Sequence, residues 1–280
     1  MSLRRVLPPA LLLLLPAALV FVGLFVWPQV GLLAESVTRP PPFGVAAYQR
    51  FLGDSFYLAM LARTLALGAC VTLVCLVCGF PLAFWLARLE SRWVPFLIMI
   101  ASFPLWVSAV VRSFAWMVLL LRNGLVSATL RDWGLAPAGF QLMYTFAGVV
   151  IALAQVLLPL MVITLYAVIR SIDRDLENAA MNLGASPASA VWLVTLRLAR
   201  GGIFAGSLLV FSLSISAFAT PSLVGGARAQ LMAVAIYEQT LELNDWPFAA
   251  AIAAILLVIA LAIALVYGRL IDTRSVPVRG

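Results

Sequence analysis

The sequence predicts an all-α membrane protein that crosses the bilayer six times, with residues 1–280 forming a single transmembrane domain. Hydrophobic residues make up 64% of the chain and charged residues only 10%, which is too little charge for the surface of a soluble domain of this length. Uncharged runs such as 9–31 and 249–267 are long enough to cross a hydrocarbon core of about 30 Å. Both observations indicate a polytopic helical membrane protein.

Six long apolar runs give the order of the predicted spans. They lie at 9–31, 58–87, 94–121, 144–169, 201–225 and 248–268. Pro81, Pro104 and Pro159 fall inside three of these spans, and each should kink its helix because it removes a backbone donor. The first run follows Arg4 and Arg5 in the manner of a signal peptide. It is longer than an ordinary signal sequence and no small-residue cleavage site follows it, so we expect a retained span.

The arginines indicate how the spans are oriented, because positive charge concentrates on the cytoplasmic side of short loops. With the N-terminus inside, the cytoplasmic side receives the larger group, Arg4, Arg5, Arg88, Arg92, Arg170, Arg174, Arg197, Arg200, Arg269, Arg274 and Arg279. The outer side receives the smaller group, Arg39, Arg50, Arg63, Arg112, Arg122, Arg131 and Arg228. We therefore predict that both termini are cytoplasmic. The net charge of +7 does not indicate nucleic-acid binding, since the arginines form no patch.

Several kinds of chemistry are excluded by residue types that the chain lacks. It has no histidine, and all 18 of its basic residues are arginine. Histidine-based metal sites and catalytic triads are therefore excluded, as is a P-loop, which needs a lysine on the nucleotide phosphates. Cys70, Cys75 and Cys78 share one apolar run, and we interpret them as small, buried helix residues. We expect no catalytic residue, metal or cofactor in this chain.

The segment 170–200 is polar although it lies between two apolar spans. Asp173 or Asp175 can cap a helix whose first turn is acidic, and Gly184 suits a left-handed stop at its C-terminus. Small apolar residues fall on one side of this helix at helical spacing, namely Leu176, Ala179, Ala180 and Leu183. The alanines permit close approach by a larger protein, so the pattern favours docking against a partner.

A second short helix should follow at once. Ser186 is a suitable N-cap and Pro187 a suitable first helical residue. The alternative for the whole segment is an amphipathic loop on the lipid headgroups. Such a loop would favour arginine and large aromatic residues, whereas the first of these helices is acidic.

The run ENAAMNLGASPASAVWLVTLRLARGGI, residues 177–203, resembles the Glu-Ala-Ala signature of permease subunits in bacterial ABC importers of the MetI-like class. That pattern is Glu-Ala-Ala, three residues, Gly, and later Ile-x-Leu-Pro. The matching positions are Ala179, Ala180, Gly184, Val194 (conservatively) and Leu196. Asn178 departs from the pattern because a glutamate is usual there, and Arg197 stands where a proline is expected.

The resemblance implies a type I ABC importer fold in which the 170–200 segment is a coupling loop that docks on a separate ATPase subunit. The residues expected in this contact are Asp175, Leu176, Glu177, Asn178, Ala179, Ala180, Leu183, Gly184, Ala185 and Ser186. It also implies two ATPase subunits that bind ATP and Mg²⁺, a second permease that is usually a different chain, and a periplasmic binding protein. The chain itself would be no enzyme.

A second resemblance narrows the family. The run FPLWVSAVVRSFAWMVLLLRNGLVSATL, residues 103–130, and the run SISAFATPSLVGG, residues 214–226, are similar to permeases of the spermidine/putrescine branch. The shared positions are Pro104, Trp106, Ser108, Arg112, Trp116, Asn123 and Gly124. The resemblance implies a MetI-like core over 58–270 and import of a polyamine. The branch also includes permeases assigned to phosphonates, iron and opine-like compounds, and these substrates stay open as alternatives.

Two groups in the spans are candidates for the translocation path or its gate. Arg112 lies near a span between Trp106 and Trp116, where an arginine is costly unless it is paired or reaches the headgroups. It can anchor an outer gate or pair with a carboxylate of a partner, or it can simply extend to the outer headgroups. Ser212, Ser216 and Thr220 recur every four residues, and this hydroxyl face can line a path or serve tight helix packing.

The predicted outer loop 226–247 carries a group of carboxylates beside aromatic residues. Glu238, Glu242 and Asp245 accompany Tyr237 and Trp246, a combination that suits a cation such as a polyamine. A solvated helix that contacts the binding protein explains the same residues.

These observations predict a multi-pass permease of the bacterial inner membrane. It would move a small solute delivered by a periplasmic binding protein, with energy from partner ATPase subunits. The rival hypothesis is an autonomous secondary transporter. That class needs an ionisable residue deep in a span, or inverted repeats with broken helices, and the sequence shows neither.

Overall fold

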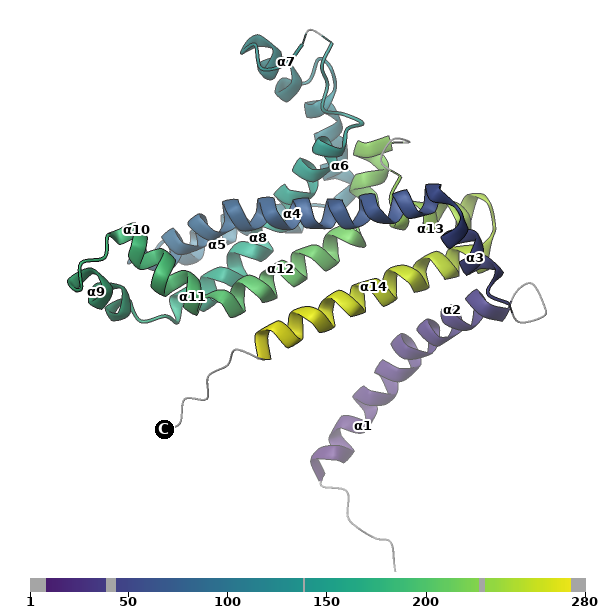
Figure 1. Ribbon diagram of the computed structural model, residues 1–280, viewed down its shortest axis with the longest axis horizontal. Helices are drawn as coiled ribbons and strands as arrows, with labels where there is room; N and C mark the ends of the chain where they lie inside the picture. Colours follow the sequence, from purple (N-terminus) through teal and green to yellow (C-terminus); the bar gives the residue numbers. More distant parts are fainter. Residues whose placement is uncertain (1–8, 39–43, 138, 227–229, 273–280) are drawn as a thin grey trace, which may run out of the picture. The chain divides into compact units, whose positions relative to one another are not determined.

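The computed structural model describes residues 9–38, 44–137, 139–226 and 230–272, and every regular element in them is a helix. In chain order they are α1 (Pro9–Phe21), η1 (Val22–Val26), α2 (Trp27–Thr38), α3 (Ala46–Gly53), α4 (Ser55–Arg88), α5 (Val94–Trp106), α6 (Ala109–Leu120), α7 (Leu125–Asp132), α8 (Phe146–Arg170), α9 (Arg174–Asn182), α10 (Pro187–Ala190), η2 (Val191–Thr195), α11 (Leu196–Leu198), α12 (Arg200–Ile215), η3 (Pro221–Gly225), α13 (Met232–Tyr237), η5 (Glu238–Glu242) and α14 (Trp246–Asp272), where η marks a π-helical segment (Figure 1).

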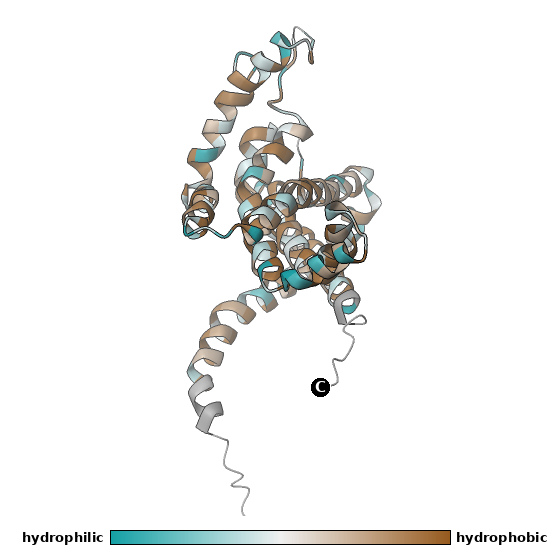
Figure 2. Ribbon diagram, turned by 90° about the vertical axis from the view of Figure 1, so that its left-hand side faces the viewer, coloured by the Kyte–Doolittle hydropathy of each residue, from teal (hydrophilic) through white to brown (hydrophobic). Residues whose placement is uncertain are grey.

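Long apolar helices confirm the prediction of an all-α membrane protein. Among the described residues, five helices are long and apolar enough to cross a membrane, and counting one bent pair as a single span gives six. The five are Leu15–Val37, Ser55–Arg88, Ala109–Asp132, Phe146–Arg170 and Trp246–Arg269. Figure 2 shows hydrophobic residues in brown along these helices.

The chain divides into two compact units, and each is described by itself. The first contains residues 1–58 and 235–258, and the second contains residues 59–234 and 259–280. In the first unit, α1, η1 and α2 follow one another without a break up to Thr38, so the first helix runs beyond the predicted end at residue 31.

An aromatic cluster holds α3 to the start of α14 in the first unit. The rings of Tyr57 and Phe248 meet edge to face, with centroids 5.0 Å apart, and Phe51 stacks on Tyr57. Arg50 lies over the Phe248 ring at 4.1 Å and forms an ion pair of 3.0 Å with Asp245. Cation–π and aromatic contacts of this kind fix the two helices against each other.

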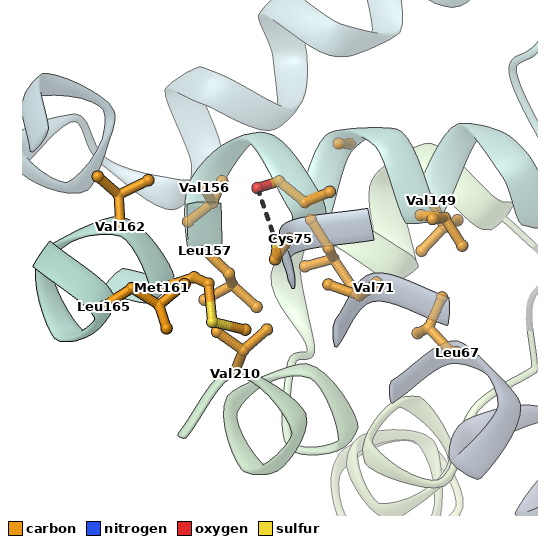
Figure 3. Packing of buried hydrophobic residues seen from close by; sticks show 14 of the residues in the cluster. Leu67, Val71, Cys75, Val149, Val156, Leu157, Met161, Val162, Leu165 and Val210 are labelled. Carbon is orange, nitrogen blue, oxygen red and sulfur yellow. Dashed lines mark hydrogen bonds between the residues drawn. The ribbon is translucent and has the colours of Figure 1, made fainter. Parts of the chain in front are cut away.

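The core of the second unit lies where α4, α8 and α12 run side by side (Figure 1). Figure 3 shows side chains from α4, α8 and α12 meeting there, with the thiol of Cys75 directed at the carbonyl of Ala154, 3.5 Å away. Cys75 is buried, but Cys70 and Cys78 are exposed. The expectation that all three cysteines are buried is therefore wrong for Cys70 and Cys78, because only one face of α4 packs inward.

Small residues allow α12 to approach α8 closely. A Cβ atom at Gly202 would lie 2.8 Å from Cγ2 of Val168, and one at Gly206 would lie 2.8 Å from Sδ of Met161. Glycines four residues apart on one helix face let two backbones approach at this distance. The backbones of α8 and α12 therefore lie in close contact in the second unit's core.

The predicted span over 94–121 is broken into two helices just after Pro104, where a kink was expected. α5 ends at Trp106, Val107 is extended (φ −83°, ψ 134°), and α6 begins at Ala109. The guanidinium of Arg112 donates to the carbonyls of Pro104 and Val107, at 2.7 and 3.1 Å. These bonds satisfy carbonyls at the end of α5 that a continuous helix would have satisfied itself.

The predicted span over 201–225 is one helix only in its first part. α12 ends at Ile215, and the short helix Pro187–Leu198 precedes it at an angle of 68°. Beyond α12 the chain forms η3, which begins at Pro221. Proline has no N–H for the carbonyl four residues earlier, so an α-helix cannot continue through this position undisturbed.

Candidate functional site

The first candidate is α9, and the local sequence explains how it begins and ends. Asp173 accepts a hydrogen bond from the backbone N–H of Asp175 at 2.9 Å, which confirms a cap at the predicted start. At the other end Gly184 has a φ of +94°, a left-handed conformation that glycine adopts without strain. The N–H groups of Gly184 and Ala185 bond to the carbonyls of Met181 and Ala180, at 2.9 and 3.1 Å. These two hydrogen bonds form a Schellman motif, which ends the helix.

The second short helix starts as the sequence predicts. Ser186 accepts a hydrogen bond from the N–H of Ser189 at 3.2 Å, and Pro187 occupies the first helical position. Two short helices therefore lie between α8 and α12. The ordered caps mean that the segment holds its shape through its own local bonds.

Most of the apolar residues of α9, and Leu183 at its C-cap, are turned away from the chain, whereas Ala180 is half-buried. Leu183 is 90% exposed, and Leu176, Met181 and Ala179 are exposed as well. Asn178 is also exposed and donates to the carboxylate of Asp175 at 3.4 Å. An ordered helix that presents apolar side chains outward is typical of a protein docking surface.

The carboxylate of Glu177 is turned the other way, into the chain. It accepts hydrogen bonds from Arg88 at the end of α4 and from the buried hydroxyl of Thr195 in η2. Arg88 and Thr195 are 89 and 18 residues away from Glu177 in sequence, so no local pattern predicts these contacts. The one available signal was Arg88 itself, an arginine that ends a long apolar run.

The second candidate is the break between α5 and α6. Nη1 of Arg112 donates to the carbonyls of Pro104 and Val107 at the end of α5. Its Nε is buried without a partner among the described residues. Trp106 is 78% exposed, whereas Trp116 is half-buried and donates to Oε1 of Gln155 on α8 at 3.4 Å. The roles proposed for these three residues in a gate stay predictions.

Ser212, Ser216 and Thr220 do not lie on one helix, so the predicted hydroxyl face of the fifth span is wrong. Ser212 lies in α12, Ser216 caps its C-terminus, and Thr220 follows the end of that helix. Ser216 is exposed, while Thr220 is buried and shares a hydrogen bond of 3.1 Å with Ser113 of α6. The break before Pro221 separates residues that hydropathy had placed on one helix. Ser113, which the sequence analysis missed, links the two broken spans.

The third candidate is the carboxylate group beside α14, in the first unit. Asp245 pairs with Arg50 at 3.0 Å and accepts from the N–H of Phe248 at 3.2 Å, so it caps α14. Glu238 and Glu242 lie at the two ends of η5 and are exposed. Partial burial, and next the neighbouring charge of Glu242, raise the pKa of Glu238 above its ordinary value.

A groove of about 810 Å³ lies in the same unit, between α2 and the residues around η5. It is lined by Pro28, Gly31, Leu32, Glu35, Ile236, Thr240, Asn244, Trp246, Pro247, Ala249 and Ala250. The indole N–H of Trp246 donates to Asn244 at 2.8 Å. Glu238, Glu242 and Asp245 do not line this groove, so the structure does not bring the predicted carboxylates together around one cavity.

Comparisons with known proteins agree with this geometry. The sequence model of one family, described as "binding-protein-dependent transport system inner membrane component", matches residues 77–274. The spermidine/putrescine transport system permease protein PotB of Escherichia coli (strain K12) is 34% identical over 227 residues, covering 81% of this chain and 82% of PotB. The molybdenum transport system permease protein ModB of Mycobacterium bovis is 33% identical over 195 residues, covering 70% of this chain and 72% of ModB.

Solved structures are similar in fold. A chain from the crystal structure of a bacterial alginate ABC transporter, in complex with an alginate pentasaccharide-bound periplasmic protein, has a TM-score of 0.77. The alignment covers 92% of each chain at 19% sequence identity. A second alginate transporter structure gives a TM-score of 0.74, with 95% of this chain covered.

Proposed function

The chain belongs to the family of binding-protein-dependent transport system inner membrane components, and from this premise we propose that it carries a polyamine such as spermidine or putrescine. As a member of that family it is a multi-pass permease of the inner membrane and part of an ABC importer. The proposal adds the substrate class, the site of coupling to the ATPase, and the orientation of the chain.

The coupling site that we propose is α9 with the turn that follows it, residues 175–186. The observation that carries this assignment is the outward apolar face of a helix whose two ends are fixed by local bonds. Such a face contacts water only at a cost, and a groove on a partner subunit would remove it from water. The Glu-Ala-Ala-type pattern at 178–184 supports an ATPase subunit as that partner.

The remaining parts of the assembly follow from this assignment. We place α9 and both termini in the cytoplasm and the 232–247 segment outside, where it would face the periplasmic binding protein. Two ATPase subunits that hold ATP and Mg²⁺ and a second permease chain complete the importer, with residues 58–270 as the MetI-like core. Closure of the ATPases would pull on α9 and change the side from which the path between the permeases is open.

The substrate class rests on the relatives. The match to PotB of Escherichia coli covers more than four fifths of both chains and supports a polyamine. A molybdenum permease matches at nearly the same identity over a shorter region, and transport measurements with both solutes distinguish the two substrates. A cation is also compatible with the exposed carboxylates of Glu238 and Glu242.

The test is ATP hydrolysis and uptake in proteoliposomes that contain the complete importer and its binding protein, with Gly184→Asp in this chain. Gly134→Asp is the matched control, because Gly134 also has a positive φ of 71° and no atom within 4 Å of an added Cβ, but lies just after α7. Since a carboxylate at residue 184 would enter an apolar docking contact, we expect Gly184→Asp to lower stimulated ATP hydrolysis about tenfold. Gly134→Asp should leave it close to that of the unaltered chain.

The result separates the two parts of the proposal. Stimulation by polyamine-loaded binding protein that is lost only in Gly184→Asp supports both parts. Stimulation by a different ligand overturns the polyamine assignment and leaves the docking site in place. Equal activity in Gly184→Asp and Gly134→Asp overturns the docking site.

A further inference from the structure

A buried ion pair joins α9 to the end of α4, within the second unit. Nη2 of Arg88 lies 2.5 Å from Oε1 of Glu177, and each side chain is only 13% exposed. Nη1 of the same guanidinium donates to the carbonyl of Ile172 at 3.0 Å, directly after α8. The guanidinium also lies 5.8 Å from the centre of the Phe84 ring. Arg88 therefore contacts three parts of the chain around the start of α9.

The carboxylate extends this contact to the second short helix. Thr195 is fully buried in η2, and its hydroxyl donates to the same oxygen of Glu177 that receives Arg88. One carboxylate oxygen thus connects α4, α9 and η2. Hydrogen bonds to an ionised group are short and directional, so a tilt of α9 against α4 would have to break both of them together.

A second ion pair beside the first serves as an internal contrast. Nη1 of Arg174 lies 2.5 Å from Oε1 of Glu90, but these side chains are 37% and 76% exposed. Water screens an exposed pair and solvates its members when they separate, whereas members of a buried pair that separate stay desolvated. The buried Arg88–Glu177 pair therefore resists a change in the position of α9 more strongly than the exposed Arg174–Glu90 pair does.

We propose that Arg88 and Glu177 are positioning residues that make α4, α9 and η2 move as one body when the ATPase subunits act on α9. This inference rests on the coupling function proposed above. It gives Glu177 a role different from that of its neighbours Leu176 and Leu183, whose side chains point outward. The carboxylate transmits the movement into the membrane and does not take part in the docking contact.

The core of the unit explains why α4 is a suitable recipient of this movement. A Cβ atom at Gly68 of α4 would lie 2.7 Å from the side chain of Ile215 and 2.8 Å from that of Phe211, both on α12. Interiors packed this closely transmit displacement and do not absorb it. Without the ion pair, we expect α9 to move while α4 stays behind, so that ATP is hydrolysed without a matching movement of the spans.

The first experiment measures solute molecules imported per ATP hydrolysed, in proteoliposomes holding the complete importer. The variants are Arg88→Gln, Glu177→Gln and the charge-reversed double variant Arg88→Glu/Glu177→Arg, with Glu90→Gln as the control from the exposed pair. We expect each single Arg88 or Glu177 variant to keep the ATPase subunits bound and to lower the ratio about tenfold. The double variant should recover part of the loss, and Glu90→Gln should match the unaltered chain.

The second experiment measures movement directly and does not depend on transport. Spin labels at Trp85→Cys on α4 and Asn182→Cys on α9 would be placed in a full-length chain whose three native cysteines are alanine, assembled with its ATPase subunits. Both native side chains are exposed, so the labels do not disturb the core. We expect one narrow distance distribution with and without bound ATP, and a broader one that shifts with ATP when Arg88→Gln is added.

Three results would overturn the inference. The first is an unchanged import ratio in Arg88→Gln, and the second is a label distance that shifts with ATP in the chain with Arg88 intact. The third is loss of the ATPase subunits from Arg88→Gln to the same extent as from Gly184→Asp, which would mean that the pair only maintains the fold. Full coupling in Gly184→Asp would instead overturn the proposed docking site. That result is obtained before any Arg88 variant is made.

Discussion

Two spans of the same apolar character behave differently in this molecule. In α8, half of the apolar window is buried inside the chain, whereas none of the window in the first span, Leu15–Val37, is buried. Both segments pass the same test of length and hydropathy. Hydropathy therefore identifies a helix that can enter a membrane but does not reveal whether its side chains will meet protein or lipid.

Small residues account for the difference. α8 carries Gly148, Ala152 and Ala154 among its buried residues, and glycines on α12 let that helix approach it. The part of the first span whose side chains are described is dominated by large apolar residues, including Leu19, Leu24 and Phe25. Without a hydrophobic force between helices in lipid, close packing of small residues is what holds spans together.

The largest expected effect contrasts a buried leucine with an exposed one. Leu165 in α8 is fully buried and Leu19 in the first span is 65% exposed. Because Leu165→Ala leaves a cavity in a packed core, we expect it to lower the free energy of unfolding by about 3 kcal/mol. Leu19→Ala should change it by less than about 0.5 kcal/mol. Denaturant unfolding of the purified chain in detergent checks both values. Equal losses of unfolding free energy in the two variants would contradict the contrast between the two spans.

A smaller effect is expected where a methyl group is added between helices. In Gly202→Ala the new Cβ would meet Cγ2 and Cβ of Val168 at 2.8 and 2.9 Å, and a β-branched side chain has little freedom to withdraw. We expect a loss of about 2 kcal/mol in the same unfolding measurement. The matched control is Gly23→Ala in the first span, where no atom lies within 4 Å. A loss in that control as large as in Gly202→Ala would contradict the packing argument.

One turn further along α12 the same change should cost less. The Cβ of Gly206→Ala would meet Sδ of Met161 at 2.8 Å, near the end of a flexible side chain. Methionine can change rotamer at low cost, so we expect a loss of about 1 kcal/mol. The ratio of the two losses tests whether the stiffness of the neighbour sets the effect. A Gly206→Ala variant less stable than Gly202→Ala would show that it does not.

The smallest effect lies outside both spans, at Glu238. Its pKa is raised in the folded chain, so the folded state binds a proton more tightly than the unfolded state. Stability conferred by that proton is present below the raised pKa and falls as pH rises from the ordinary glutamate pKa through the raised one. Because Glu238 is exposed, we expect a shallow slope that Glu238→Gln removes. Unfolding midpoints measured across acidic pH check this, and a slope of opposite sign would contradict it.

Local features of the fold could be predicted from the sequence because they depend on neighbouring residues. The cap at Asp173, the stop at Gly184 and the restart at Ser186 each need only a side chain and the backbone two or three positions away. The spans could be predicted because a long apolar run has few stable environments other than the membrane. The apolar stripe of α9 was predicted from helical spacing, and its members Leu176, Ala179 and Leu183 are exposed while Ala180 is half-buried.

The missed features depend on residues far apart or on the backbone. Hydropathy does not detect the extended residue Val107 or the missing N–H of Pro221, so each broken span was predicted as one apolar run. The bond between Ser113 and Thr220 joins residues 107 positions apart. No pattern within a window can identify such pairs, and the Arg88–Glu177 pair belongs to the same class.

The unburied first span also bears on how chains of this kind diverge. Lipid requires only that the side chains it contacts are hydrophobic, so leucine, valine, phenylalanine and isoleucine are nearly interchangeable there. Each residue between α8 and α12, in contrast, has to fit a space of fixed shape. Neutral drift should therefore erase resemblance near the N-terminus first.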